Sequence, residues 1–268
     1  MNILQRNFFR LLRSGALNEY ESLEPMSLYK WQQLAKLIER QGVAEIAVKG
    51  LRNHTFDESA NFPKKMIDDL QAYAATSEKK DSRLPRLSNR LLNRRLRKIQ
   101  KGERHQIDAS MPTLDLLNII VKNISLILNN GISLSAISEL GSYLRTRGDK
   151  VDFVKLDGWL EKLHIKRLAQ LEGSILISVF EFDQDEIPFV EKVEPEAYPL
   201  ILRTLEHTAT DTTEEWHFRQ RKTGFVVNNS KVMRRNLRRS IRYINYAPIE
   251  TSSNFLNNFA KSLSEIEE

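Results

Sequence analysis

The stretch PTLDLLNIIVKNISLIL, residues 112–128, is the most hydrophobic helical pattern in this chain. Proline suits the first turn of a helix, so Pro112 marks its start. Its apolar residues recur at three- and four-residue intervals, namely Leu114, Leu117, Val121, Ile124 and Leu128. The pattern predicts a helix at the centre of the core. Because Asp115 and Lys122 interrupt the run, which is shorter than the roughly 20 residues that span a bilayer, we expect no transmembrane segment.

The same spacing predicts helices on both sides of this segment. They cover residues 1–15, the segments around Trp31 and after Pro63, and segments near Ser133, Asp152, Leu168, Glu196, Ser230 and Phe255. Ser133 and Asp152 are suited to cap their helices, while Gly42 and Gly148 are suited to helix ends. Residues 168–182 have a strand-like composition, but their three- and four-residue spacing favours a helix.

The composition supports a predominantly helical chain. Of 268 residues, 41% are hydrophobic and 28% charged, with only 10 glycines and 8 prolines. We therefore expect an all-α fold with orthogonal or bundle-like packing and at most a minor β element. The absence of cysteine excludes a disulfide framework, a thiolate metal site and a cysteine nucleophile, and it favours a cytoplasmic location.

Changes in composition suggest three regions along the chain. They are an amino-terminal helical region (1–77), a basic helical linker (78–111) and a carboxyl-terminal helical domain (112–268). The linker contains an apolar stripe made of Leu84, Leu87, Leu91, Leu92, Leu96 and Ile99, which predicts an amphipathic helix.

Two arginine-rich helices are the strongest candidates for a functional surface. One lies in the linker, and the other runs from about Ser230 to Tyr243 with a predicted inward stripe of Met233, Leu237, Ile241 and Ile244. The candidate residues for a polyanion or partner surface are Arg90, Arg94, Arg97, Arg234, Arg235 and Arg238. The simplest interpretation is a solvated face, or one paired with the acidic stretch from Glu181 to Glu215. A net charge of +6 does not by itself require a polyanionic partner.

The common catalytic signatures are absent from the sequence. Its five histidines lack metal-ligand spacing, and there is no nucleophile elbow, phosphate-binding loop or dinucleotide-binding motif. Gly141-Ser142 precedes Asp149 and Asp152, but paired carboxylates for a nucleotidyl-transfer metal site would stand one residue apart on a strand. We therefore predict no catalytic residue, no metal ligand and no cofactor.

Several segments resemble a known family. NFFRLLRSG (7–15) and WQQLAKLIERQGV (31–43) are similar to the amino-terminal helices of poorly characterised bacterial nucleotidyltransferase-like proteins. Four further segments resemble the carboxyl-terminal helical region of that family, namely GISL (131–134), Glu139-Leu, VDF (151–153) and Trp159-Leu. The segment YAPIE (246–250) resembles a part of the family nearer its carboxyl end. The resemblance implies helical flanks around an α/β catalytic core with a Lys-Gly turn and a downstream Asp-x-Asp pair. Lys49-Gly50 matches that turn superficially, but Asp57-Glu58 does not supply the pair. Too few residues precede Pro112 for the core, so we expect a degenerate active site.

Three functions remain open at this point. The leading hypothesis is a non-catalytic accessory or interaction protein that binds a protein partner or itself, which an exposed apolar patch beside an arginine-rich helix would support. A divergent metal-dependent nucleotidyltransferase would need two of Glu139, Asp149 and Asp152 to converge beside a pocket. A nucleic-acid-binding protein would use the two arginine helices, with an affinity that falls steeply with salt.

Overall fold

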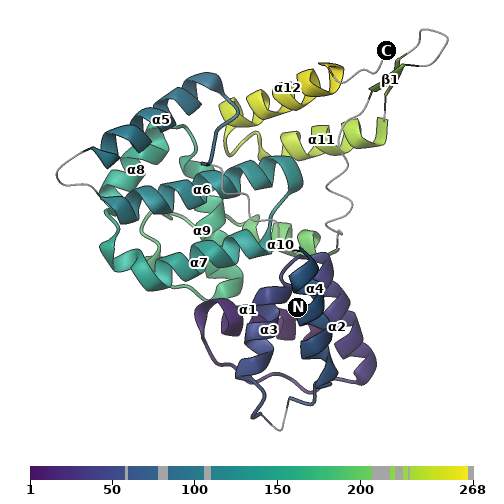
Figure 1. The fold of residues 1–268 in the computed structure, drawn as a ribbon. Coiled ribbons are helices and arrows are strands. Elements are labelled where there is room, and N and C mark those ends of the chain that lie inside the picture. Colours follow the sequence, from purple (N-terminus) through teal and green to yellow (C-terminus); the bar gives the residue numbers. More distant parts are fainter. Residues whose placement is uncertain are drawn as a thin grey trace.

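In the computed structural model, helices account for most of the described chain (Figure 1). The structure describes residues 1–57, 60–77, 84–105, 110–206, 218–220, 226–228 and 230–264. These residues form twelve α-helices, two short 3-10 helices and one two-stranded sheet. The predicted all-α fold with a minor β element is therefore confirmed.

The amino-terminal part of the chain forms four helices. They are α1 (Ile3–Leu17), α2 (Leu28–Arg40), α3 (Ala44–Asn53) and α4 (Lys65–Ser77). Gly42 follows α2 with a positive φ of 63°, as a residue without a β-carbon allows, so the predicted helix end is confirmed. Helix α3 was not predicted, because its buried face consists mainly of small residues, among them Ala44, Ala47 and Gly50.

Helices α1 and α3 cross at very short range because each has a glycine at the crossing. A β-carbon on Gly15 would overlap the carbonyl oxygen of Ile46, and one on Gly50 would overlap the carbonyl oxygen of Leu11. Lys49-Gly50 is therefore part of this helix crossing, in the interior of α3. Lys49 itself is exposed and bonded to Glu45 on the same helix, at 3.1 Å.

The rest of the chain surrounds a central helix. Its elements are α5 (Arg90–Arg104), α6 (Met111–Asn130), α7 (Leu134–Arg147), η1 (Gly148–Lys150), α8 (Phe153–Lys162), α9 (Lys166–Phe180), η2 (Gln184–Glu186), α10 (Ala197–Glu206), α11 (Ser230–Tyr243) and α12 (Pro248–Ser264). Strands β1 (Phe218–Gln220) and β2 (Val226–Asn228) pair antiparallel, with Arg219 opposite Val227. Residues 221–225, between the two strands, lie outside the described residues.

The local helix signals in this part of the chain were read correctly. Ser133 accepts the amide of Ala136 at 3.3 Å, and Asp152 accepts the amide of Lys155 at 2.9 Å, so both are N-caps. The ambiguous run 168–182 is helical as expected, with α9 ending at Phe180. Gly148 does end α7, but with an ordinary right-handed conformation (φ −59°), because a 3-10 turn continues the chain there.

Helix α6 is the centre of the core, as the sequence predicts. It contacts α5, α7, α8, α9, α11 and α12. Its 20 residues exceed the predicted length, and within the described chain it is the one helix long and apolar enough to cross a bilayer. More than half of its most apolar window is buried inside the fold, so packing accounts for its composition without a membrane.

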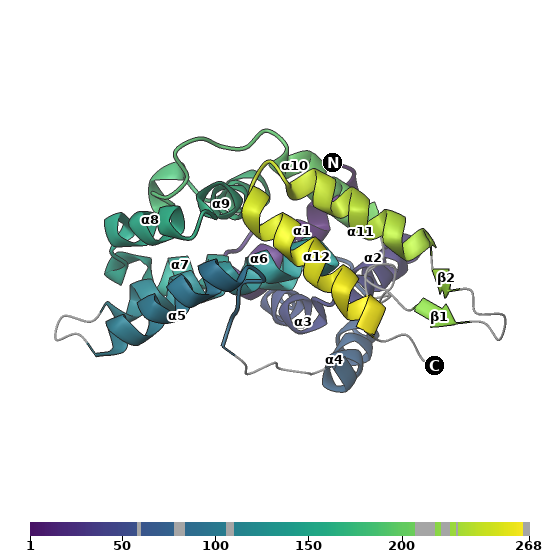
Figure 2. The same cartoon turned by 90° about the horizontal axis from the view of Figure 1, so that it is seen from above.

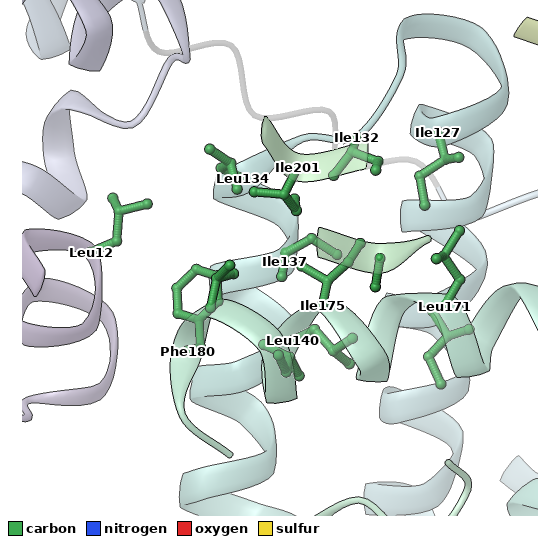
Figure 3. Packing of buried hydrophobic residues seen from close by; sticks show 14 of the residues in the cluster. Leu12, Ile127, Ile132, Leu134, Ile137, Leu140, Leu171, Ile175, Phe180 and Ile201 are labelled. Carbon is green, nitrogen blue, oxygen red and sulfur yellow. The ribbon is translucent and has the colours of Figure 1, made fainter. Parts of the chain in front are cut away.

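A single hydrophobic cluster extends from Phe8 in α1 to Ala247 before α12. Figure 3 shows part of it, where Ile137 and Leu140 of α7 lie beside Ile175 and Phe180 of α9. Helix α1 also contacts α7 and α9, which joins the amino-terminal helices to the rest. The division of the chain at residues 77 and 111 stays a prediction.

Candidate interaction surface on helices α5 and α11

The inward side of α5 fixes this helix firmly on α6. Asn89 caps the helix by accepting the amides of Leu91 and Leu92, at 3.0 and 3.1 Å. Leu92 and Leu96 are buried, and Gln100 donates to Asn118 of α6 at 2.9 Å. Glu103 is also buried, bonded to Lys155 and to the amide of Ser110; these hydrogen bonds outweigh burial and lower its pKa.

The predicted stripe of α5 is correct only in part. Leu87, Leu92 and Leu96 are buried and Ile99 is partly buried, but Leu91 is 71% exposed. Leu84 lies before the helix and is 53% exposed. The helix begins later than the pattern suggests because Asn89 caps it at Arg90.

The outward side of α5 carries a set of cations that have no partner among the described residues. The predicted residues Arg90, Arg94 and Arg97 are all exposed there, together with Lys98, Lys101 and Arg104. None of the six side chains forms an ion pair or a hydrogen bond within the described chain. Arg95, to one side, donates to the carbonyl oxygen of Lys162 at 2.9 Å.

The arginines of α1 show what internally paired charge looks like in the same molecule. Arg6 and Arg10 both bond Glu24, at 2.6 and 3.0 Å. Arg13 is buried and bonds Glu21 and Glu181. The hydrogen bond from Arg6 holds the pKa of the Glu24 carboxyl below its ordinary value.

The acidic residues in the described part of this stretch form ion pairs with cations outside α5 and α11. Glu181 bonds Arg13 of α1, and Glu186 bonds Arg145 of α7. Glu191 and Glu194 bond Lys166 and Arg167 of α9, at 2.8 and 2.9 Å. As far as Glu206, the stretch therefore forms no ion pair with either arginine helix, so its described part favours the solvated face over the paired one. Its part beyond Glu206 lies outside the described residues.

Helix α11 faces the fold with the side opposite to the predicted one. Leu237, Ile241 and Ile244 were expected to point inward, but they are 40%, 60% and 39% exposed. Arg239 and Tyr243 are the buried residues instead, at 7% and 1%. The Arg239 guanidinium donates to the carbonyl oxygen of Asn129, in the last turn of α6, where carbonyl groups lack helical partners. This non-local bond favours the observed rotation of α11.

The outward side of α11 consequently combines two rows of side chains. At 100° per residue, Leu237 and Ile241 follow one edge of the exposed side, and Arg234 and Arg238 follow the adjacent edge. Ile244 comes directly after the last residue of the helix, Tyr243. Both arginines are exposed, and neither forms an ion pair within the described chain. The side chains of Met233 and Arg235 lie outside the part that the structure describes.

Helix α12 makes polar contacts with the start of α5 and with α6. The buried Glu250 carboxylate accepts the amides of Ser88 and Asn89 at the start of α5, the second at 3.0 Å. Asn89 donates to Ser253 at 2.9 Å, and Asn254 reaches the carbonyl oxygen of Leu128 at 3.4 Å. Figures 1 and 2 show α12 between α5 and α11 on one side of α6. The two basic helices therefore lie on the same side of the molecule without forming one continuous surface.

The residues weighed for catalysis have structural contacts of their own. Glu139 bonds Lys122 at 2.6 Å, and Asp152 caps α8. A β-carbon on Gly141 would meet Leu176 and Phe182, so this glycine lies within a packed helix interface. Over the described ranges, no three histidine, aspartate or glutamate side chains are grouped so that they could hold a metal ion.

One buried polar group was missed from the sequence. Asn123 of α6, Ser138 of α7 and Glu172 of α9 are all fully buried, and Asn123 donates to Glu172 Oε2 at 3.2 Å. One oxygen of each side chain has no hydrogen-bond partner among the described residues. Burial raises the pKa of Glu172 well above its ordinary value. The signal was present, because Glu172 lies four residues after Leu168 and three before Ile175, on the apolar side of α9.

Comparisons of the chain with protein-family models, with curated proteins and with solved structures found no match. The resemblance to nucleotidyltransferase-like proteins therefore stays a prediction, and the candidate surface must be interpreted from its own chemistry.

Proposed function

We propose that this protein is a non-catalytic helical interaction module, an accessory protein related to nucleotidyltransferase-like proteins, and that α11 binds an acidic amphipathic helix of a protein partner. The observation that carries the proposal is the exposed row of Leu237, Ile241 and Ile244 beside Arg234 and Arg238. An exposed apolar row rimmed by charge is typical of a surface that another protein covers.

The packing of α11 against the fold keeps the apolar row on the outside. Rotating α11 to bury Leu237 and Ile241 would expose Tyr243 and withdraw the Arg239 guanidinium from the Asn129 carbonyl oxygen. Full burial of a leucine or isoleucine side chain contributes about 1.5–3 kcal/mol, so a partner that covers the row gains a substantial binding free energy.

The charge pattern selects the partner. Arg234 and Arg238 stand one helical turn apart on the same edge, so a helix with glutamates at a matching spacing pairs with both. Residues Leu237, Ile241 and Ile244 follow a four- and three-residue spacing, which matches the apolar stripe of a second amphipathic helix. The occupant is therefore helical, with an apolar stripe bordered by acidic residues.

Fluorescence anisotropy with a labelled synthetic peptide tests this proposal. The probe is an amphipathic helix of about 20 residues with a leucine stripe bordered by glutamates, and a second peptide has lysine in place of glutamate. We expect the acidic peptide to bind the full chain, and Leu237→Gln with Ile241→Gln to weaken binding about tenfold or more, which is about 1.4 kcal/mol. The lysine peptide should not bind.

A matched control variant carries Leu28→Gln and Val154→Gln, which change two other exposed apolar residues, 61% and 86% exposed. It should bind the acidic peptide as the unmodified chain does. Equal weakening in both variants, or no binding of the acidic peptide at all, would contradict the proposal. Sedimentation velocity could instead detect a dimer of the unmodified chain that is absent in the α11 variant. That result would identify a second copy of the chain as the occupant.

A further inference from the structure

The outward side of α5 has a charge pattern that neither the core nor the α11 surface uses. Arg90, Arg94, Arg97, Lys101 and Arg104 follow each other at alternating four- and three-residue steps. This spacing keeps all five on one edge of the helix, along about 21 Å at a rise of 1.5 Å per residue. Lys98 stands beside the row, and all six side chains are exposed.

The opposite side of the helix holds the row in place. Leu92 and Leu96 are 3% and 0% exposed, and Gln100 and Glu103 make their hydrogen bonds inward. The Glu250 carboxylate and the Asn89 side chain fix the first turn. The cations are therefore presented by a rigid element at fixed spacing, which is what recognition of a regular charge array needs.

Like charges at four- and three-residue spacing repel one another, and in α5 no described acidic side chain offsets this repulsion. In α1 every arginine has a glutamate partner. Of the six outward cations of α5, four are arginines, whose planar guanidinium groups match phosphate oxygens in a bidentate way. An anionic array that lies along the helix would relieve the repulsion.

We propose that α5 binds the phosphate backbone of double-stranded nucleic acid without sequence preference. A duplex presents one negative charge per about 1.7 Å of its axis, so a cation row of this length faces many phosphates at once. The row has no aromatic residue, which single strands need for stacking. Leu91 is the only exposed aliphatic side chain on α5 itself, so this helix lacks the apolar face that inserts into a lipid surface.

The test is fluorescence polarisation with the full chain and a labelled duplex of about 20 base pairs and arbitrary sequence, between about 50 and about 200 mM salt. Contacts with about four phosphates predict a slope of about −3.6 for log affinity against log salt, a loss of about 150-fold over that range. Replacing the duplex sequence should leave the affinity unchanged.

The variant Arg94→Gln, Arg97→Gln, Lys101→Gln should reduce the slope to about −1 and abolish most of the binding at low salt. The control variant Lys30→Gln, Lys36→Gln, Lys65→Gln removes the same charge from exposed positions of α2 and α4 and should bind nearly as the unmodified chain does. Circular dichroism should show both variants folded, since all six side chains are exposed.

Three results would overturn the proposal. They are no duplex binding at low salt, equal loss in the two triple variants, and α5-dependent binding to vesicles of phosphatidylserine and phosphatidylcholine without duplex binding. The proposal does not rest on the α11 surface, so Leu237→Gln with Ile241→Gln should leave duplex binding unchanged, and each of the two proposals can fail without the other.

Discussion

The crossing of α1 and α3 differs from the attachment of α11 and α12 to α6 in the kind of contact that holds the helices together. At the first, Gly15 and Gly50 let two backbones approach, and Phe8, Leu11 and Leu51 are fully or almost fully buried. At the second, the polar residues Arg239, Glu250 and Asn254 are buried beside Tyr243 and Ala247, while Leu237 and Ile241 of α11 face outward. Close apolar packing buries the hydrophobic side of a helix inside the fold. Attachment through hydrogen bonds can leave the hydrophobic side exposed, so that another molecule can bind it.

The substitution with the largest expected effect tests the close crossing of α1 and α3. Gly50→Ala places a methyl group against the carbonyl oxygen of Leu11, which cannot rotate away as a side chain can. We expect the free energy of unfolding to fall by about 3 kcal/mol or more, because overpacking at a backbone contact outweighs the better helix propensity of alanine. Urea denaturation measures the change.

Gly102→Ala is the matched control for this substitution. Gly102 also lies inside a helix, but a β-carbon there would meet nothing within 4 Å. This change should raise the free energy of unfolding by about 0.5–1 kcal/mol. Equal shifts in the free energy of unfolding for the two substitutions would contradict a close backbone contact between α1 and α3.

The sequence predicts the local features of this fold far better than the contacts between distant residues. The α6 pattern and the caps at Ser133 and Asp152 are local signals, and all three are confirmed. The α3 helix was missed because Ala47 and Gly50 give a weak hydrophobic signal, although small residues are what a close crossing needs.

The rotation of α11 could not be predicted from its own sequence. Periodicity shows that Leu237 and Ile241 share one side of the helix, but not whether the fold or another molecule covers that side. The deciding contact, from Arg239 to the Asn129 carbonyl oxygen, joins residues 110 positions apart. The arginines of α5 present the same difficulty, because only the structure shows that the described acidic residues bond elsewhere.

A smaller effect concerns the polar group inside the apolar core. Burial raises the pKa of Glu172 above its value of about 4.3 in an unfolded chain, so the native state favours the neutral acid. The unfolded chain ionises first as the pH rises, and stability is therefore lost between the unfolded and the folded pKa, at about 1.4 kcal/mol per pH unit.

Glu172→Gln keeps a neutral side chain of the same shape and should remove this loss. Denaturation of both proteins from about pH 4.5 upward measures the difference in their free energies of unfolding, which should shift steadily in favour of the variant. A difference that does not change with pH would show that Glu172 is ionised in the folded protein. The core would then contain a partner for that charge.

Cysteine labelling of α11 tests the central claim most directly, because the natural chain has no cysteine to interfere. Single variants Ile241→Cys, Val154→Cys and Ala247→Cys place one thiol on the proposed surface, one at an exposed reference and one at a fully buried position. We predict that a maleimide modifies positions 241 and 154 at similar rates and position 247 far more slowly. The acidic peptide should then protect position 241 alone. A thiol at position 241 that is as slow as the one at 247 in the free protein would show that the apolar row faces the core, and the proposed surface would not exist.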